Sequence, residues 1–178
     1  MHIPARFLVA ICVLACAVAG VALATPVVGL LFSNILANGN TTTPEIFTRA
    51  RVALPPVAGQ EQGDDDNNEW TGMLFLHGPT NVEVQDFGYA VNGHTGWHSH
   101  PGMLAFTLIS GTIEWYDANC NKTVYNTGDT FTENTATHYF RNVGAAPMHG
   151  MVTYFLAKGQ PRRIDQPAPA CAAALGLE

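Results

Sequence analysis

The residues best suited to chemistry are His98 and His100, which lie one residue apart within the stretch 93–102 (GHTGWHSHPG). In an extended strand, side chains two residues apart project from the same face, so the two imidazoles would lie side by side. Two such rings can ligate one metal ion. The alternative is that both are polar residues on the rim of an exposed strand, so a metal site requires a third ligand from elsewhere in the chain.

His138 is the candidate for this third ligand. It lies in the segment 137–141, which we predict to be a strand, and Asn142 follows it four residues later. If this strand faces the His98–His100 strand inside a barrel, three imidazoles form one mononuclear site. Imidazole suits iron, copper, nickel and zinc alike, so the expected cofactor is a divalent metal ion whose identity the sequence does not determine. Manganese is a further candidate. No residue is assigned as catalytic.

The elements that must position these histidines are short runs bounded by turns. Strands are expected at 70–76, 82–89, 104–109, 112–117, 123–125, 130–133, 137–141 and 148–156. Nothing between Trp70 and Leu156 has a sustained helical period. Eight or so short, closely spaced strands predict a single all-β domain, a sandwich or barrel of the jelly-roll kind.

The histidine strand resembles the first motif of the cupin family. That motif has a glycine, then His-x-His, three or four residues, a glutamate, six residues and a glycine. Leucine stands here in the place of the glutamate. The matching positions are Gly93, His98, His100, Leu104 and Gly111.

The segment around the third histidine resembles the second cupin motif. There the family has a glycine, five residues, proline-x-glycine, a histidine and, four residues later, an asparagine. In this chain the proline and the second glycine are replaced, and one residue is missing between the first glycine and the histidine. The corresponding positions are Gly128, Asn134, Ala136, His138 and Asn142.

The resemblance, which covers roughly residues 80–157, implies a cupin-type jelly-roll barrel (a double-stranded β-helix). It also implies that His98, His100 and His138 are the metal ligands. Leu104 cannot bind a metal, so three neutral imidazoles would leave a divalent ion its full double charge and open positions for water or a chelating anion. Three-histidine cupins that activate dioxygen make a dioxygenase one implied function, and zinc-based hydrolase or lyase chemistry another. A non-catalytic cupin that binds or senses a small ligand is the alternative.

Composition and charge restrict the partners. The chain of 178 residues has a formal net charge of −6, and its only basic pair is Arg162-Arg163. A nucleic-acid surface needs clustered basic side chains, so nucleic acid is excluded as an expected partner. A pocket lined by the aromatic residues of the predicted strands would favour an apolar or aromatic small molecule. The family resemblance also implies a homodimer, and an exposed sheet edge would favour one.

The ends of the chain indicate export. Residues 7–24 are almost purely apolar and end in the A-x-A pattern at 22–24, so residues 1–24 are predicted to be a signal peptide. An uncleaved membrane anchor is the alternative. Residues 25–69 are expected to be an N-terminal extension with an acidic loop, residues 70–157 the barrel and residues 158–178 a tail. Cys120 and Cys171 remain after cleavage, which predicts one disulfide in an oxidising compartment.

The other ionisable residues are expected to matter less. His94 is either an acid or base at the pocket mouth or, as its loop position favours, an exposed histidine. His77 and His149 have no pattern that assigns them a role. Glu114 and Glu133 are single strand residues that nothing in the sequence pairs.

Overall fold

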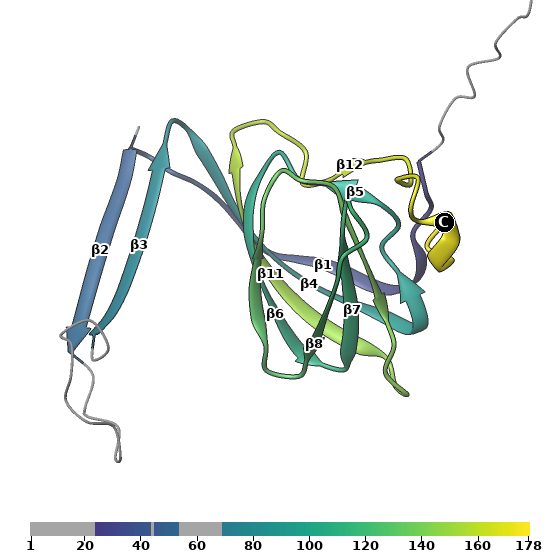
Figure 1. The fold of residues 1–178 in the computed structure, drawn as a ribbon. Helices are drawn as coiled ribbons and strands as arrows, with labels where there is room; N and C mark the ends of the chain where they lie inside the picture. Colours follow the sequence, from purple (N-terminus) through teal and green to yellow (C-terminus); the bar gives the residue numbers. More distant parts are fainter. Residues whose placement is uncertain (1–23, 44, 54–68) are drawn as a thin grey trace, which may run out of the picture.

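The strands form one curled antiparallel sheet and a separate two-stranded hairpin (Figure 1). The computed structural model describes residues 24–43, 45–53 and 69–178. The ten-stranded sheet runs in the order β12-β5-β10-β4-β11-β6-β9, with β1 paired to β4, and β7 paired to β10 and β8. The strands are β1 (Val28–Asn40), β2 (Glu45–Ala53), β3 (Glu69–His77), β4 (Thr80–His94), β5 (His98–Ser99), β6 (Gly102–Ser110), β7 (Thr112–Asp117), β8 (Lys122–Asn126), β9 (Thr130–Glu133), β10 (His138–Asn142), β11 (Met148–Ala157) and β12 (Ile164–Asp165).

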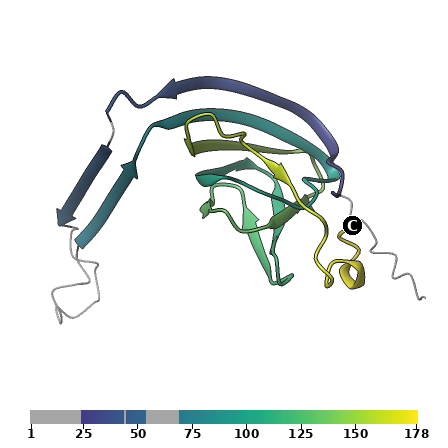
Figure 2. The same ribbon diagram turned by 90° about the horizontal axis from the view of Figure 1, so that it is seen from above.

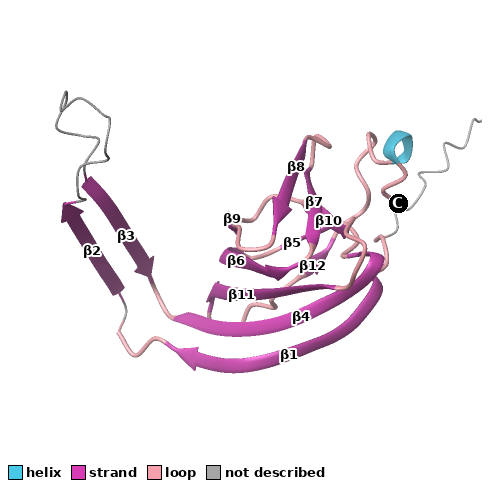
Figure 3. Cartoon of the chain, turned by 90° about the horizontal axis from the view of Figure 1, so that it is seen from below, coloured by secondary structure: helices cyan, strands magenta, loops and turns pink. Residues whose placement is uncertain are grey.

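The predicted all-β jelly-roll fold is confirmed. The expected strands at 112–117 and 130–133 have the observed bounds, and the other six expected strands differ from the observed ones mainly at their ends. The long strands β1 and β4 lie side by side and curve around the shorter strands (Figures 2 and 3). This curvature gives the sheet an inner face, on which the side chains of one set of alternating positions meet.

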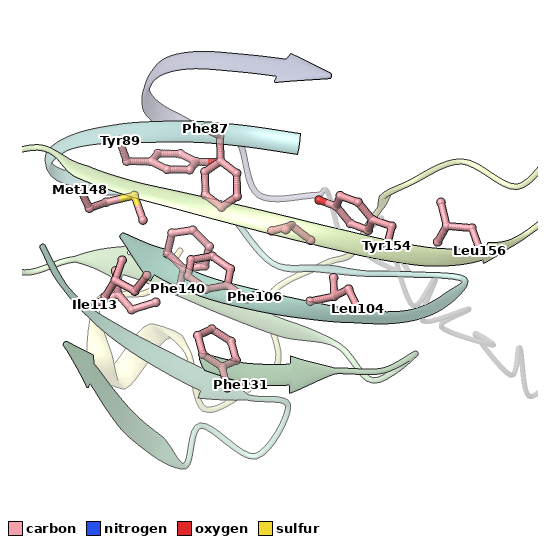
Figure 4. Packing of buried hydrophobic residues seen from close by; sticks show 12 residues of the cluster. Phe87, Tyr89, Leu104, Phe106, Ile113, Phe131, Phe140, Met148, Tyr154 and Leu156 are labelled. Carbon is pink, nitrogen blue, oxygen red and sulfur yellow. The ribbon is translucent and has the colours of Figure 1, made fainter. Parts of the chain in front are cut away.

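The inner face is packed with aromatic rings (Figure 4). Burial along β11 alternates residue by residue, as the period of two in the sequence requires. Phe87 from β4, Phe106 from β6 and Phe140 from β10 meet pairwise, with ring centroids 5.5 to 6.1 Å apart. Gly150 of β11 lies against this group, because a Cβ there would come within 2.7 Å of the Phe106 ring. The core therefore joins strands that are distant in sequence.

The predicted N-terminal extension contains two strands in the part that the structure describes. Residues 28–40 form β1, which pairs with β4, and residues 45–53 form β2, which pairs with β3. The physical reason is that pairing satisfies the backbone groups of an apolar segment that would otherwise be solvated. The β2–β3 hairpin projects from the barrel (Figure 2) and exposes Phe47, Met73 and Phe75.

The predicted signal peptide, apart from Ala24, and most of the acidic loop lie outside the described residues. The division of the chain at residues 24, 69 and 157 stays a prediction. Among the described residues, no helix has the length and apolar character that crossing a membrane would require.

The C-terminal tail is fixed to the barrel. The predicted disulfide between Cys120 and Cys171 is present and ties the tail to the turn between β7 and β8. The end of the chain forms a short 3₁₀ helix, η1 (Ala173–Leu175). Leu177 packs with Trp97 in a second buried cluster, which is separate from the aromatic core. The tail is therefore part of the packed structure beside the histidine strand.

Glu114 of β7 links three strands through its carboxylate. Lys122 of β8 donates to its Oε1 at 2.8 Å, while Arg141 of β10 and the hydroxyl of Tyr116 each donate to its Oε2 at 2.7 Å. Burial raises the pKa of Glu114, but these hydrogen bonds outweigh burial and lower the pKa to about 2. The network therefore stabilises the fold only while Glu114 is ionised.

Glu114→Gln is expected to lower the free energy of unfolding at pH 7 by about 1–2 kcal/mol, a value discounted for the solvent around Lys122. Because the folded-state pKa lies below the unfolded value, the stabilisation by Glu114 is complete above about pH 4.5 and is lost as the pH falls towards 2. Urea unfolding between pH 7 and pH 2 should show a shallower acid loss in the variant. Glu45→Gln, on the projecting hairpin, is the control. Parallel profiles for Glu114→Gln and wild type would contradict the prediction.

Candidate metal centre

The structure brings the three predicted histidines together. β5 and β10 pair antiparallel with His98 opposite His138, and His100 follows directly after β5. The ring centroids lie 4.9 Å apart for His98 and His100, 4.3 Å for His98 and His138, and 5.0 Å for His100 and His138. All three side chains are buried. Neither ring of the His-x-His pair lies on an exposed rim, so that alternative is wrong.

Two of the rings are oriented by the backbone just before them. Nδ1 of His98 lies 3.0 Å from the carbonyl oxygen of Gly96, and Nδ1 of His138 lies 2.9 Å from that of Ala136. Because a carbonyl oxygen can only accept, each Nδ1 carries the proton and donates it. In the neutral ring, Nε2 then carries a free lone pair, which is the form of imidazole that ligates a metal.

The third ring is oriented from the C-terminal tail. Nδ1 of His100 donates to the carbonyl oxygen of Arg162. The buried Nε2 of His138 has no hydrogen-bond partner. The ligand atoms that the three histidines offer all lie within 4.8 Å of one another. Three lone pairs that converge in a buried space fit one divalent cation, so these residues could hold the metal that the sequence implies.

Burial favours the neutral, ligating form of His98. It lowers the pKa of His98 well below its usual value, and the neighbouring charges of His138 and Arg163 lower it further. At neutral pH the ring is therefore neutral, with its one proton on Nδ1, and a metal ion does not have to displace a proton from Nε2.

A buried carboxylate, which the sequence analysis left unpaired, faces the same cluster. Glu133, the last residue of β9, places Oε2 3.2 Å from Nε2 of His138 and 3.5 Å from Nε2 of His100. The indole N–H of Trp115 donates to the other oxygen, Oε1, at 2.7 Å. Burial raises the pKa of Glu133, but His138 and His100 outweigh burial and hold that pKa below its ordinary value. No sequence pattern assigns a partner to Glu133, and the structure places it beside His100, His138 and Trp115.

The family comparison agrees with this arrangement of strands and histidines. Residues 86–154 match the family model described as the cupin domain. This part of the chain is therefore a cupin domain. No curated protein matches it.

Three solved structures that resemble this chain each match less than half of it. A conserved protein with a double-stranded β-helix domain from Klebsiella pneumoniae is 22% identical, with a TM-score of 0.42, over 48% of this chain and 75% of that chain. A cupin domain from Bordetella pertussis is 18% identical, with a TM-score of 0.38, over 43% and 82%. A chain from the structures of the DMSP lyases RdDddP and RnDddQII is 19% identical, with a TM-score of 0.42, over 48% and 44%. This chain therefore spans less than half the length of that lyase chain.

A cavity of about 400 Å³ adjoins the histidines inside the cupin barrel. Burial raises the pKa of Tyr89 to about 12 and also raises the pKa of Tyr154, so both phenols are protonated at neutral pH. The hydroxyl of Tyr154 donates to Oε1 of Gln85 at 2.8 Å. The cavity thus combines an apolar wall with polar groups. Its lining includes Gln85, Phe87, Tyr89, His98, His100, Leu104, Phe106, Glu133, Phe140, Tyr154, Arg162 and Arg163.

Among the residues that the structure describes, His77, His94 and His149 lie outside the metal-binding group. Nδ1 of His94 accepts from the backbone N–H of Gly96 at 3.3 Å, and its ring stacks on Tyr139 at a centroid distance of 5.3 Å. His94 is therefore partly buried, not freely exposed, and its contacts stabilise the loop before β5. His77 faces Glu45 across the projecting hairpin, with Nδ1 3.4 Å from Oε1.

Proposed function

We propose that the protein is an exported cupin that holds one divalent metal ion through His98, His100 and His138 and acts with it on a small molecule. The observation that supports this most directly is the common orientation of the three rings. Each donates from Nδ1 to a backbone carbonyl and leaves Nε2 as a lone pair. A cluster of buried histidines that served only packing would have no need for three matching orientations.

A divalent metal at these nitrogens would supply a Lewis acid, and iron would also supply dioxygen chemistry, which makes an oxygenase the reaction class to test first. The chain's own residues bind the substrate and exclude water. The rings of Phe87, Phe106 and Phe140 form a dry wall for the cavity. In such surroundings charges are weakly screened, so a substrate group near the histidines is held strongly.

The cavity lining favours a small molecule with an apolar or aromatic body and an anionic group. Arg162 and Arg163 both line the cavity. Arg162 donates to Oε2 of Glu83 at 3.0 Å, and Arg163 donates to the carbonyl oxygen of Thr95 at 2.8 Å. These bonds hold the guanidinium groups in place, and each retains further N–H donors for a carboxylate.

Metal analysis of the purified protein tests the proposal. Wild type is expected to contain about one divalent ion per chain, and His98→Ala is expected to lose it. His94→Ala is the matched control, because this neighbouring histidine lies outside the group and should leave the metal content unchanged. A metal-free wild type that still binds a small aromatic carboxylate would instead support the non-catalytic alternative. Oxygen uptake by the iron-loaded protein with such carboxylates then tests the reaction class.

Export is tested separately. The disulfide between Cys120 and Cys171 supports an oxidising compartment. The mass of the mature chain should correspond to cleavage after Ala24. A mass that includes residues 1–24 would favour the membrane-anchored alternative.

A further inference from the structure

Leu104 stands where the first cupin motif has a glutamate. It faces the carboxylate of Glu133 on the neighbouring strand. β6 and β9 pair antiparallel with Leu104 directly opposite Glu133. Directly opposite residues of an antiparallel pair project from the same face of the sheet. Both residues are buried and both line the cavity. The carboxylate of Glu133 therefore enters the space that Leu104 borders, from the strand next to it.

The position of Oε2 fits a shared metal ligand. In a tetrahedral centre with bonds of about 2.0–2.2 Å, ligand atoms lie about 3.3–3.6 Å from one another. Oε2 of Glu133 lies 3.2 Å from Nε2 of His138 and 3.5 Å from Nε2 of His100. These separations are close to those between ligands of one ion.

The chemistry of the facing atoms requires a positive charge between them. An ionised carboxylate has only acceptor sites, and Nε2 of a ring protonated at Nδ1 is also an acceptor. When the ring is neutral, two acceptors face each other at 3.2 Å, and a shared cation, either a metal ion or a proton, would remove their repulsion. A proton on Nε2 of His138 is the alternative to a metal ion, but the two atoms do not have the geometry of a hydrogen bond at their separation of 3.2 Å. Oε2 of Glu133 therefore lies within reach of a cation that Nε2 of His138 and Nε2 of His100 would also bind.

We propose that Glu133 is the fourth ligand of the metal ion and replaces, from β9, the ligand that Leu104 cannot supply from β6. This inference rests on the proposed function, because it assumes that the three histidines bind the ion. The bond from Trp115 to Oε1 fixes the carboxylate and leaves Oε2 for the metal. The centre then has a net charge of +1, in contrast to the double charge expected for three neutral imidazoles alone.

Glu133→Gln tests the inference in the full-length protein. Glutamine has the same shape and can still accept the hydrogen bond from Trp115, so only the charge and one ligand oxygen change. Titration with Co²⁺ should show an affinity at least about tenfold lower than that of wild type, together with a changed visible absorption spectrum of the bound ion. Glu114→Gln is the matched control, because it removes a carboxylate from β7 outside the site and should leave both readouts unchanged.

The outcomes separate the two proposals. Binding of Co²⁺ by Glu133→Gln with wild-type affinity and spectrum would overturn the inference and leave the three-histidine site intact. A wild type that binds no Co²⁺ would overturn both. If the variant fails to fold, infrared difference spectra of wild type with and without Zn²⁺ decide the matter. A shifted carboxylate stretch supports ligation by Glu133, and a spectrum without any carboxylate band overturns it.

Discussion

Replacing His138 by alanine is expected to abolish the stabilisation of the protein by metal. A ligand that binds only the folded state adds about 2.7 kcal/mol at a concentration of 100 times its dissociation constant. For a chain of this size that corresponds to a rise in melting temperature of roughly 5–10 °C. Loss of one of the converging nitrogens should weaken binding at least about 100-fold, so the same metal concentration would add only about 0.4 kcal/mol.

The measurement is the shift in melting temperature on adding Zn²⁺ or Co²⁺ to each protein. Because each variant is compared with itself, any loss of stability caused by removing a buried ring cancels. His94→Ala should retain the full shift, since His94 contacts Gly96 and Tyr139 and not the metal-binding group. An undiminished shift in His138→Ala would contradict the assignment of the site.

Local periodicity was sufficient to predict much of this site. The spacing of His98 and His100 requires a shared face in any extended strand, and the structure shows the two rings 4.9 Å apart. The backbone partners of His98 and His138 are also local, since each ring bonds a carbonyl two residues earlier in the chain. Such features depend on the dihedral angles of a few neighbouring residues, and the local sequence predicts these angles.

The local sequence does not predict how strands that are distant in the chain pair with one another. Glu133 reaches the histidines because β9 pairs with β6 in one particular register, and a shift by one residue would point its side chain to the other face. The isolated sequence TFTE does not determine this register. The same holds for β1, which lies in the predicted N-terminal extension and forms a strand by pairing with the long strand β4. The carbonyl of Arg162 is 62 residues from His100 and could not have been inferred.

Replacing Trp97 by alanine is expected to be the most destabilising change beside the site. Trp97 is fully buried, its Nε1–H donates to the carbonyl oxygen of Leu177 at 2.7 Å, and its ring lies 5.4 Å from that of Tyr139. Removing a buried indole leaves a large cavity and costs about 3–5 kcal/mol. Urea unfolding of the metal-free protein measures this loss. Trp97→Phe, which keeps an aromatic ring but not the N–H donor, should lose about 1–2 kcal/mol.

Trp97→Ala should also weaken metal binding, although Trp97 contributes no ligand. β5 is only two residues long, and its pairing with β10 joins one residue of each strand, His98 and His138. So short a strand cannot maintain its own position, and the tail holds it through β12, which pairs with β5. Trp97 links the tail to this strand. We therefore expect Trp97→Ala to bind Co²⁺ about tenfold more weakly than wild type, even under conditions in which the variant is fully folded. Trp97→Phe should bind Co²⁺ nearly as tightly as wild type. Equal affinities for wild type and Trp97→Ala would show that the strand is positioned without the tail.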